Sequence, residues 1–342
     1  MEKIVLGRTG LLVGRSGFGA IPIQRIGFDE AAAILRRAYN GGINFFDTAR
    51  GYSDSEEKIA YALSGVRHEI IIATKSPASN AEALVKDLET SLTKLKTDYI
   101  DIYQLHNPDY LPEYGSSIYQ ALLNAKKQGK IRFISISNHR RDLAAEMVRS
   151  GLFDTLQFPV SALSDDRDFE LVKLCKELNV GFIAMKAMSG GLITDPAPTF
   201  TLLRSYGNIV PIWGIQYMRE LEQFLALEEN PPELNDEMRK NIARDKAELS
   251  GNFCRGCGYC MPDCPAGIPI SLAARMSFLL RRTSTANFVT PEFQAKMDKI
   301  RDCTNCGSCR AHCPYDLDTP ALLQREYGSY RKYITENSRA GA

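Results

Sequence analysis

The chain has 342 residues, a formal charge of +1, and 44% hydrophobic and 24% charged residues. This length predicts two domains, and the balanced charge provides no basic block for nucleic acid or for an anionic membrane surface. No apolar run is long enough to span a membrane and no apolar targeting segment opens the chain, so we expect neither nucleic acid nor a membrane as a partner.

Short apolar runs rich in Ile, Val and Phe alternate with segments of helical periodicity along the first two-thirds of the chain. The apolar runs predict strands at residues 16–21, 44–48, 70–75, 99–106, 131–137, 155–160, 181–187 and 209–213. The periodic segments predict helices that include residues 29–39, 55–63, 81–95, 116–128 and 142–149. Asp29 is expected to cap the first of these helices.

Nearly continuous apolar strands followed by crossover helices are typical of a parallel sheet covered by helices on its outer face. Eight such units predict an α/β fold, a closed (β/α)8 TIM barrel over residues 1–230, with an open doubly wound sheet as the alternative. Before the first unit, residues 4–6 and 11–13 flank a Gly-Arg-Thr-Gly sequence, which predicts a hairpin that plugs the bottom of the barrel.

Titratable side chains close three successive predicted strands. Asp47 ends the second strand and Tyr52 follows it in the loop, while Lys75 ends the third strand and His106 the fourth. In such barrels the carboxyl ends of the strands carry the chemistry. We therefore expect these four residues to form a catalytic site.

Four motifs carry a resemblance to a known family. They are residues 44–52 (Asn-Phe-Phe-Asp-Thr-Ala-Arg-Gly-Tyr), 73–75 (Ala-Thr-Lys), 104–106 (Gln-Leu-His) and 135–138 (Ser-Ile-Ser-Asn). Their order and spacing resemble the signatures of the aldo-keto reductases, over about residues 1–230. The resemblance implies an oxidoreductase that reduces a small carbonyl compound, or oxidises the alcohol, with NADPH or NADH.

The resemblance implies that Tyr52 is the general acid and that Lys75 activates it. It implies further that Asp47 holds Lys75 and that His106 orients the carbonyl oxygen. The chemistry of these side chains fits those roles. A free tyrosine has a pKa of about 10, and a nearby ammonium group favours the phenolate and lowers that value. A carboxylate beside the lysine keeps the lysine charged.

The resemblance places a nucleotide at the same strand ends. The candidate contacts are Ser137, Asn138, Gln157, Val160, Lys186, Met188, Gly191, Gly214 and Arg219. Three departures from the family pattern weaken this site. Val160 stands where the family usually has a tyrosine, residues 186–188 replace a Ser-Pro-Leu sequence, and only Arg219 offers a cation for a 2′-phosphate. A flavin such as FMN is therefore an alternative to the nicotinamide.

Eight of the nine cysteines lie in two copies of the pattern C-x2-C-x2-C-x3-C-P. The first copy consists of Cys254, Cys257, Cys260 and Cys264, and the second of Cys303, Cys306, Cys309 and Cys313. This pattern is typical of bacterial ferredoxins with two 4Fe–4S clusters, in which the fourth cysteine of each run ligates the other cluster. Cys313 is thus expected to join the first three cysteines of the first run, and Cys264 those of the second run.

Structural zinc is the alternative for these cysteines, but a zinc site has no use for the third close cysteine or the trailing proline. The ninth cysteine, Cys175, lies among apolar residues at helical spacing and is predicted to be a core residue. Thiolate-bound clusters imply a reducing compartment, hence the cytoplasm. His68 and His139 are expected on the surface.

The rest of the chain predicts a helical linker over residues 231–250 and an α-rich ferredoxin-like domain over residues 251–342. This domain has helical spacing at residues 271–280, between the runs, and a closing helix at 321–333. A nicotinamide moves two electrons and a cluster moves one, so several arrangements stay open. The clusters accompany nicotinamide chemistry, take electrons from a flavin, or exchange them with ferredoxin or another redox protein. An electron-transfer module with a non-catalytic barrel is a further alternative.

Overall fold

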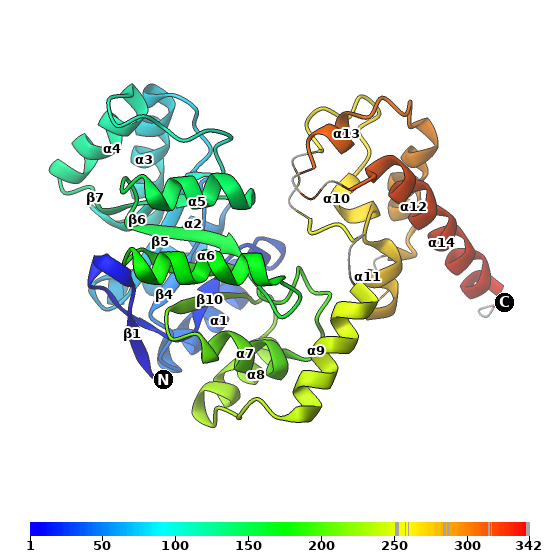
Figure 1. Ribbon diagram of the computed structural model, residues 1–342, viewed down its shortest axis with the longest axis horizontal. Helices are drawn as coiled ribbons and strands as arrows, with labels where there is room; N and C mark the ends of the chain where they lie inside the picture. The colour runs from blue at the N-terminus through cyan, green and yellow to red at the C-terminus, as the bar shows by residue number, and fades with distance from the viewer. Residues whose placement is uncertain are drawn as a thin grey trace. The chain divides into compact units, whose positions relative to one another are not determined.

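The computed structural model describes residues 1–249, 253–256, 258, 260–282, 285, 288–313, 315 and 317–339. The chain divides into two compact units (Figure 1). The first consists of Met1–Ala187 and Asp195–Ile242, and the second of Met188–Thr194 and Ala243–Ala342. The expected linker, residues 231–250, is thus shared between the units, and a short segment inside the predicted barrel groups with the second unit.

The first unit is built on a closed barrel of eight strands, each hydrogen-bonded to its neighbours in parallel. The strands are β3 (Gly17–Gly19), β4 (Phe45–Asp47), β5 (Ile71–Ser76), β6 (Ile100–His106), β7 (Ile131–Ser137), β8 (Thr155–Pro159), β9 (Gly181–Met185) and β10 (Ile209–Gly214). Closure follows from the pairing of β10 with β3. The predicted (β/α)8 barrel is confirmed, and the open doubly wound sheet was the wrong alternative.

Helices follow the strands and cover the barrel. They are α1 (Phe28–Asn40), α2 (Ser55–Leu63), α3 (Ala81–Leu95), α4 (Ser117–Lys127), α5 (Arg141–Arg149), α6 (Asp166–Glu177), α7 (Pro196–Ser205) and α8 (Met218–Glu229), with the short turns η2 (Pro22–Arg25) and η3 (Ser64–Glu69). The expected cap of α1 was wrong, because Gly27 is the N-cap. Asp29 lies in the first turn and accepts a hydrogen bond from the Tyr61 hydroxyl at 2.9 Å.

The N-terminal hairpin closes the bottom of the barrel, as predicted. It consists of β1 (Lys3–Val5) and β2 (Leu12–Gly14), with the turn η1 (Gly7–Thr9) between them. Leu6 and Leu11 are buried in one cluster with residues from the amino ends of the barrel strands, including Phe45, Ile71, Ile183 and Val210. Gly7 has a φ of 51°, and a Cβ there would lie 2.2 Å from the Gly181 nitrogen, so this contact requires glycine.

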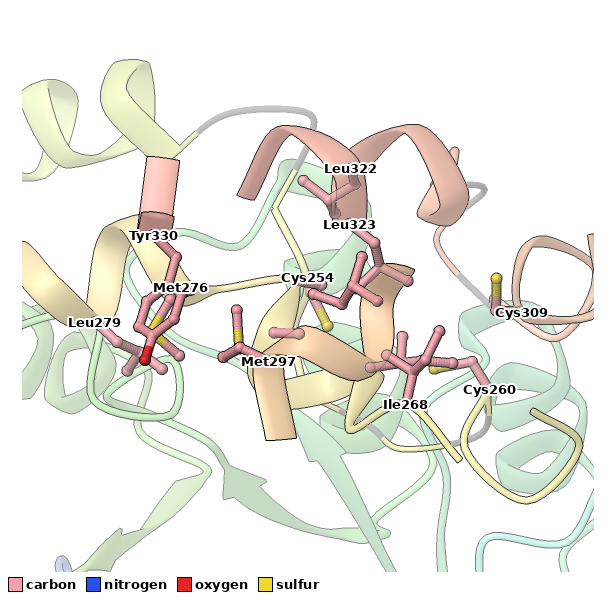
Figure 2. Packing of buried hydrophobic residues seen from close by; sticks show 14 of the residues in the cluster. Cys254, Cys260, Ile268, Met276, Leu279, Met297, Cys309, Leu322, Leu323 and Tyr330 are labelled. Carbon is pink, nitrogen blue, oxygen red and sulfur yellow. The ribbon is translucent and has the colours of Figure 1, made fainter. Parts of the chain in front are cut away.

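The second unit is helical, as expected. Its elements are α9 (Asp236–Leu249), which begins in the first unit, α10 (Ile270–Ala273), α11 (Met276–Arg282), α12 (Pro291–Asp298), η5 (Lys299–Asp302), α13 (Ser308–Ala311) and α14 (Thr319–Arg339). The helical pattern at residues 271–280 is split into α10 and α11, and the closing helix is longer than predicted. Figure 2 shows that Leu322, Leu323 and Tyr330 of α14 pack into one apolar cluster with Cys254 and other buried residues of this unit.

Among the described residues, no helix combines the length and the apolar character that spanning a membrane requires. Cys175 is fully buried in α6, and His68 is exposed, as predicted for both.

Candidate active site and cysteine clusters

The barrel brings the expected catalytic residues together at the carboxyl ends of neighbouring strands. Asp47 ends β4, Lys75 lies near the end of β5 and His106 ends β6. The Lys75 ammonium donates to Asp47 Oδ2 at 2.7 Å and to the Thr48 carbonyl at 2.6 Å. Both side chains of this pair are buried. The pair is therefore removed from bulk water, and its mutual attraction is stronger in this buried position than it would be in water.

Tyr52 reaches the same place from the loop after β4. Its backbone N–H donates to the Ala49 carbonyl at 3.0 Å, so the loop turns back toward the strand end. The Lys75 ammonium lies 5.2 Å from the centre of the Tyr52 ring. The His106 ring meets the Tyr52 ring edge to face, with 6.0 Å between their centres. The phenol thus stands between a buried cation and an imidazole.

Burial dominates the acid–base properties of this site. It raises the pKa of Tyr52 above its usual value, while Lys75 pulls that pKa down and Asp47 pushes it up. The expected lowering by Lys75 is present, but desolvation outweighs it. Burial also raises the pKa of Asp47, against the opposing effects of Lys75 and a hydrogen bond from Gln157.

His106 is held in its neutral form. Burial, and then the charge of Lys75, lower the pKa of His106 from 6.5 to about 3. A neutral imidazole carries one N–H and one free nitrogen lone pair. At neutral pH His106 can therefore donate a hydrogen bond without bringing a second cation beside Lys75.

The candidate nucleotide contacts on β7 and β8 are already hydrogen-bonded within the barrel. Gln157 accepts from the Gln104 amide at 2.8 Å. The Asn138 amide donates to the Pro108 carbonyl at 2.8 Å and accepts from the Arg140 backbone at 2.7 Å. Ser137 donates to the Leu105 carbonyl at 3.4 Å. Asn138 Oδ1 can still accept a second hydrogen bond, because an amide oxygen has two lone pairs.

The remaining nucleotide candidates are dispersed. Val160 is buried just after β8, and Lys186 follows β9 with a left-handed φ of 56°. Met188 and Gly191 belong to the segment that groups with the second unit. Gly214 is the exposed last residue of β10. The Arg219 guanidinium lies 4.3 Å from the centre of the Tyr217 ring, at the start of α8.

A carboxylate that the sequence analysis missed caps the start of α8. Glu220 Oε2 accepts from the backbone N–H groups of Gln216 at 2.8 Å and Tyr217 at 3.0 Å. Backbone N–H groups at a helix start favour phosphate, so Glu220 occupies donors that an anion would use. The acidic residue three positions into the helix was the available signal.

The expected surface position of His139 was wrong. Its side chain is only partly exposed, and burial, followed by the charges of Lys186 and His106, holds its pKa well below the usual value. Its backbone N–H donates to the Asn107 side chain at 3.2 Å. Its position directly after the residue 135–138 motif could have indicated that it faces the site.

In the second unit, four cysteines from both runs line one pocket. Cys264 of the first run lies there with Cys303, Cys306 and Cys309 of the second run. Pro320 and Leu323 of α14 contribute to the apolar part of the lining. This is the combination that the exchange of the fourth cysteine between runs requires.

The spacing of the described thiols does not suit a single ion. Four sulfurs bound to one zinc at about 2.3 Å lie within roughly 4 Å of one another. Within the part of the chain that the structure describes, no three His, Cys, Asp or Glu side chains could hold one metal ion. Thiols that surround a pocket fit a larger inorganic group such as a 4Fe–4S cluster.

The other proposed cluster site is described in part, because Cys257 lies outside the described residues. Cys254 and Cys260 are buried in the apolar cluster of Figure 2, and Cys313 packs against that cluster. The Gly256 N–H donates to Cys254 Sγ at 3.3 Å. Gly256 has a φ of 65°, so the backbone curls there and directs an amide at the sulfur.

A parallel barrel with titratable side chains at its strand ends, joined to a unit with two cysteine runs of the ferredoxin type, indicates an oxidoreductase with iron–sulfur clusters. The model of the aldo/keto reductase family matches residues 11–200, and that of a 4Fe-4S dicluster domain matches residues 253–318. The chain belongs to the aldo/keto reductase family and carries this dicluster domain, which confirms the resemblance and makes zinc the wrong alternative.

Named relatives match the barrel part of the chain. L-galactose dehydrogenase of Arabidopsis thaliana is 32% identical over 219 residues, which cover 58% of this chain and 69% of the relative. NADH-specific methylglyoxal reductase of Escherichia coli is 29% identical over 240 residues, covering 60% of this chain and 72% of the relative.

Solved structures agree with the barrel fold. The holo form of an aldo-keto reductase from Bacillus halodurans has a TM-score of 0.63 at 22% identity, covering 72% of this chain and 96% of that one. An aldo/keto reductase from Klebsiella pneumoniae in complex with NADP and acetate has a TM-score of 0.60 at 20% identity, covering 71% and 95%. At these identities the likeness establishes the fold alone.

Proposed function

We propose that this protein reduces a small carbonyl compound, or oxidises the corresponding alcohol, with NADH or NADPH, and that Tyr52 is the general acid. The observation that carries the proposal is the buried pair of Lys75 and Asp47 beneath the Tyr52 ring, with His106 against the ring edge. Similar proteins of the family include a methylglyoxal reductase, a dehydrogenase and a reductase in complex with NADP.

When bound, the nicotinamide supplies a hydride to the carbonyl carbon. The charge that develops on the carbonyl oxygen must be met by a proton, and the Tyr52 hydroxyl provides it. Because burial raises the pKa of Tyr52, the phenolate that remains needs a nearby cation. Lys75 is that cation, and Asp47 holds it in place.

His106 orients the carbonyl oxygen in this mechanism. Its imidazole is neutral at physiological pH, since its pKa lies near 3. A neutral imidazole donates one N–H to the oxygen and does not compete with Tyr52 as an acid. The site therefore has one proton donor and one hydrogen-bond donor for a single oxygen.

NADH is expected to bind at least as well as NADPH. The resemblance places a 2′-phosphate in the turn after β10, where Glu220 takes two backbone N–H groups. A carboxylate there repels a phosphate, and Arg219 is the cation that the sequence offers in that turn. FMN is left out of the proposal, because the family members that are named for a nucleotide use NADH or bind NADP.

We propose further that two 4Fe–4S clusters transfer single electrons to or from ferredoxin or another redox protein. Cys254, Cys257, Cys260 and Cys313 would hold one cluster, and Cys264, Cys303, Cys306 and Cys309 the other. Of the second set, Cys306 is exposed and Cys309 buried, so one edge of that pocket faces solvent. An exposed edge gives a redox partner an approach to the cluster.

The test of the catalytic proposal is Tyr52→Phe. This variant keeps the ring beside Lys75 and His106 but removes the proton donor, so carbonyl turnover should fall by roughly 10²–10⁴-fold or more. Nucleotide affinity, measured by quenching of NADH fluorescence, should remain within about twofold of the wild-type value, since the Tyr52 hydroxyl acts on the carbonyl oxygen and not on the nucleotide. Undiminished turnover would remove Tyr52 from the mechanism.

A further inference from the structure

The segment Met188–Thr194 leaves the barrel after β9 and returns to it before α7, yet it groups with the second unit. Its backbone is tightly wound. Ser189, Gly190 and Gly191 have consecutive left-handed φ angles of 51°, 68° and 89°. Gly191 and Ile193 both donate to the Met188 carbonyl, at 3.0 and 3.3 Å. The two glycines adopt such angles without strain, whereas Ser189 does so at a cost that surrounding contacts must offset.

One such contact comes from Arg275, in the break between α10 and α11. The Arg275 Nε donates to the Ser271 carbonyl at 2.9 Å, which fixes the guanidinium. Its Nη1 donates to the Gly190 carbonyl at 3.4 Å. A Cβ at Gly190 would lie 2.6 Å from this Nη1, so the guanidinium uses the space that a side chain would fill.

The same guanidinium also lies against the first cysteine run. A Cβ at Gly256 would lie 3.1 Å from Arg275 Cζ and 3.3 Å from both terminal nitrogens. Gly256 in turn donates its N–H to Cys254 Sγ. Arg275 is thus packed between two glycine backbones, one in the segment Met188–Thr194 and one beside a proposed cluster ligand.

We propose that Arg275 is a positioning residue that makes nucleotide binding by the segment Met188–Thr194 depend on the first cysteine run. The inference rests on the proposed function, and on the expectation from the family resemblance that Met188 and Gly191 contact the nucleotide. The Arg275 guanidinium is planar and is fixed by Ser271. A displacement of the first cysteine run at Gly256 therefore moves the guanidinium that donates to the Gly190 carbonyl. The segment continues directly into β9 and α7, so its conformation bears on the strand end that carries Lys186.

The experiment compares Arg275→Ala with Arg275→Lys in the iron-loaded protein. Lys332→Ala serves as the control, because it removes an exposed cation, 77% accessible, from α14 of the same unit. Hydrogen–deuterium exchange over residues 188–194 reports the segment without any nucleotide present. Fluorescence titration with NADH reports the affinity, and iron content reports the clusters.

Arg275→Ala should raise deuterium uptake at residues 188–194 and weaken NADH binding by roughly 5- to 150-fold, the range of ordinary site-to-site coupling. Iron content and the exchange of other barrel peptides should stay at wild-type values. Arg275→Lys should restore the phenotype in part at most, because an ammonium cannot contact both glycines as a planar fork does. Lys332→Ala should change neither readout.

Unchanged exchange at residues 188–194 in Arg275→Ala would overturn the proposal, as would raised exchange with unaltered NADH affinity. Failure of the wild-type protein to bind NADH or NADPH would instead refute the proposed function, and the nucleotide part of this inference with it. Should Arg275→Ala lose iron, Gly190→Ala tests the same contact from outside the cysteine runs. It should raise exchange more than Gly191→Ala, which has open space around its Cβ, and equal exchange in the two would overturn the proposal.

Discussion

The buried pair of Lys75 and Asp47 allows a test that separates stability from catalysis. Their side chains are 1% and 3% exposed. Lys75→Met keeps a similar volume but leaves the Asp47 carboxyl without its cation. Breaking a buried pair by removing one partner costs about 3–5 kcal/mol. We expect Lys75→Met to lower the free energy of barrel unfolding by about that amount at pH 7.

A matched control removes a lysine from an exposed pair. Lys173 and Glu170 lie 2.6 Å apart on α6, with side chains 58% and 65% exposed. Surface pairs contribute about 0–1 kcal/mol. Lys173→Met should therefore change the free energy of unfolding far less than Lys75→Met does, although it removes the same charge.

The chain provides its own reporter for this measurement. Trp213 is its single tryptophan, fully buried in β10. It stacks on Phe224 with 4.3 Å between ring centres and donates to Ser16 Oγ at 2.8 Å. Tryptophan fluorescence during urea unfolding thus follows the barrel and not the second unit, which avoids treating the whole chain as one two-state system.

The double variant Lys75→Met/Asp47→Asn completes the test. Because this variant leaves no buried carboxylate without a cation, its free energy of unfolding should be roughly 2 kcal/mol or more above that of Lys75→Met. Turnover should stay about 10²–10⁴-fold below wild type in both variants, because Tyr52 lacks its cation. The reasoning fails if Lys75→Met is as stable as Lys173→Met, or if the double variant regains turnover.

Three further outcomes are expected. The pKa of His106 is about 3 in the folded protein, against 6.5 in the unfolded chain, so its contribution to stability is full above pH 6.5 and is lost toward pH 3. Between pH 6.5 and 4, the wild-type protein should therefore lose more stability than His106→Gln, by at most about 1.4 kcal/mol per pH unit. Equal losses in the two proteins would contradict the lowered pKa of His106. Glu220→Gln should tighten NADPH binding by roughly 3- to 10-fold with little change for NADH in parallel titrations, and an equal gain for both nucleotides would exclude charge repulsion as the cause. In anaerobic iron and sulfide assays, Cys264→Ala should lose about half of the iron, and Cys175→Ala should keep all of it. Full iron content in Cys264→Ala would show that Cys264 is not a cluster ligand.

Much of the barrel could be predicted because its signals are local. Strands β5 to β8 begin and end within one residue of the predicted positions, since buried parallel strands are apolar along their whole length. Helix starts were less predictable. Asp29 has the chemistry of a cap, but Gly27 occupies that position with an extended backbone, and Asp29 lies in the first turn of the helix.

The site was predicted by residue type and position, but its electrostatics were not. Asp47, Lys75 and His106 meet because their strands are neighbours in a closed barrel. The net rise in the Tyr52 pKa, the neutral state of His106 and the enclosure of His139 depend on how completely the surrounding loops exclude water. That quantity is a sum over residues distant in the chain, so no local pattern reports it.

By itself the amino-acid sequence determined the two cysteine runs, the alternation of strands and helices and the four candidate catalytic positions, because each is a matter of spacing along the chain. Only the tertiary structure decided that Trp213 donates a hydrogen bond to Ser16 and that Arg275 joins the segment Met188–Thr194 to Gly256. Both are contacts between residues far apart in sequence. They arise because packing, and not periodicity, selects which surfaces of the helices and loops meet.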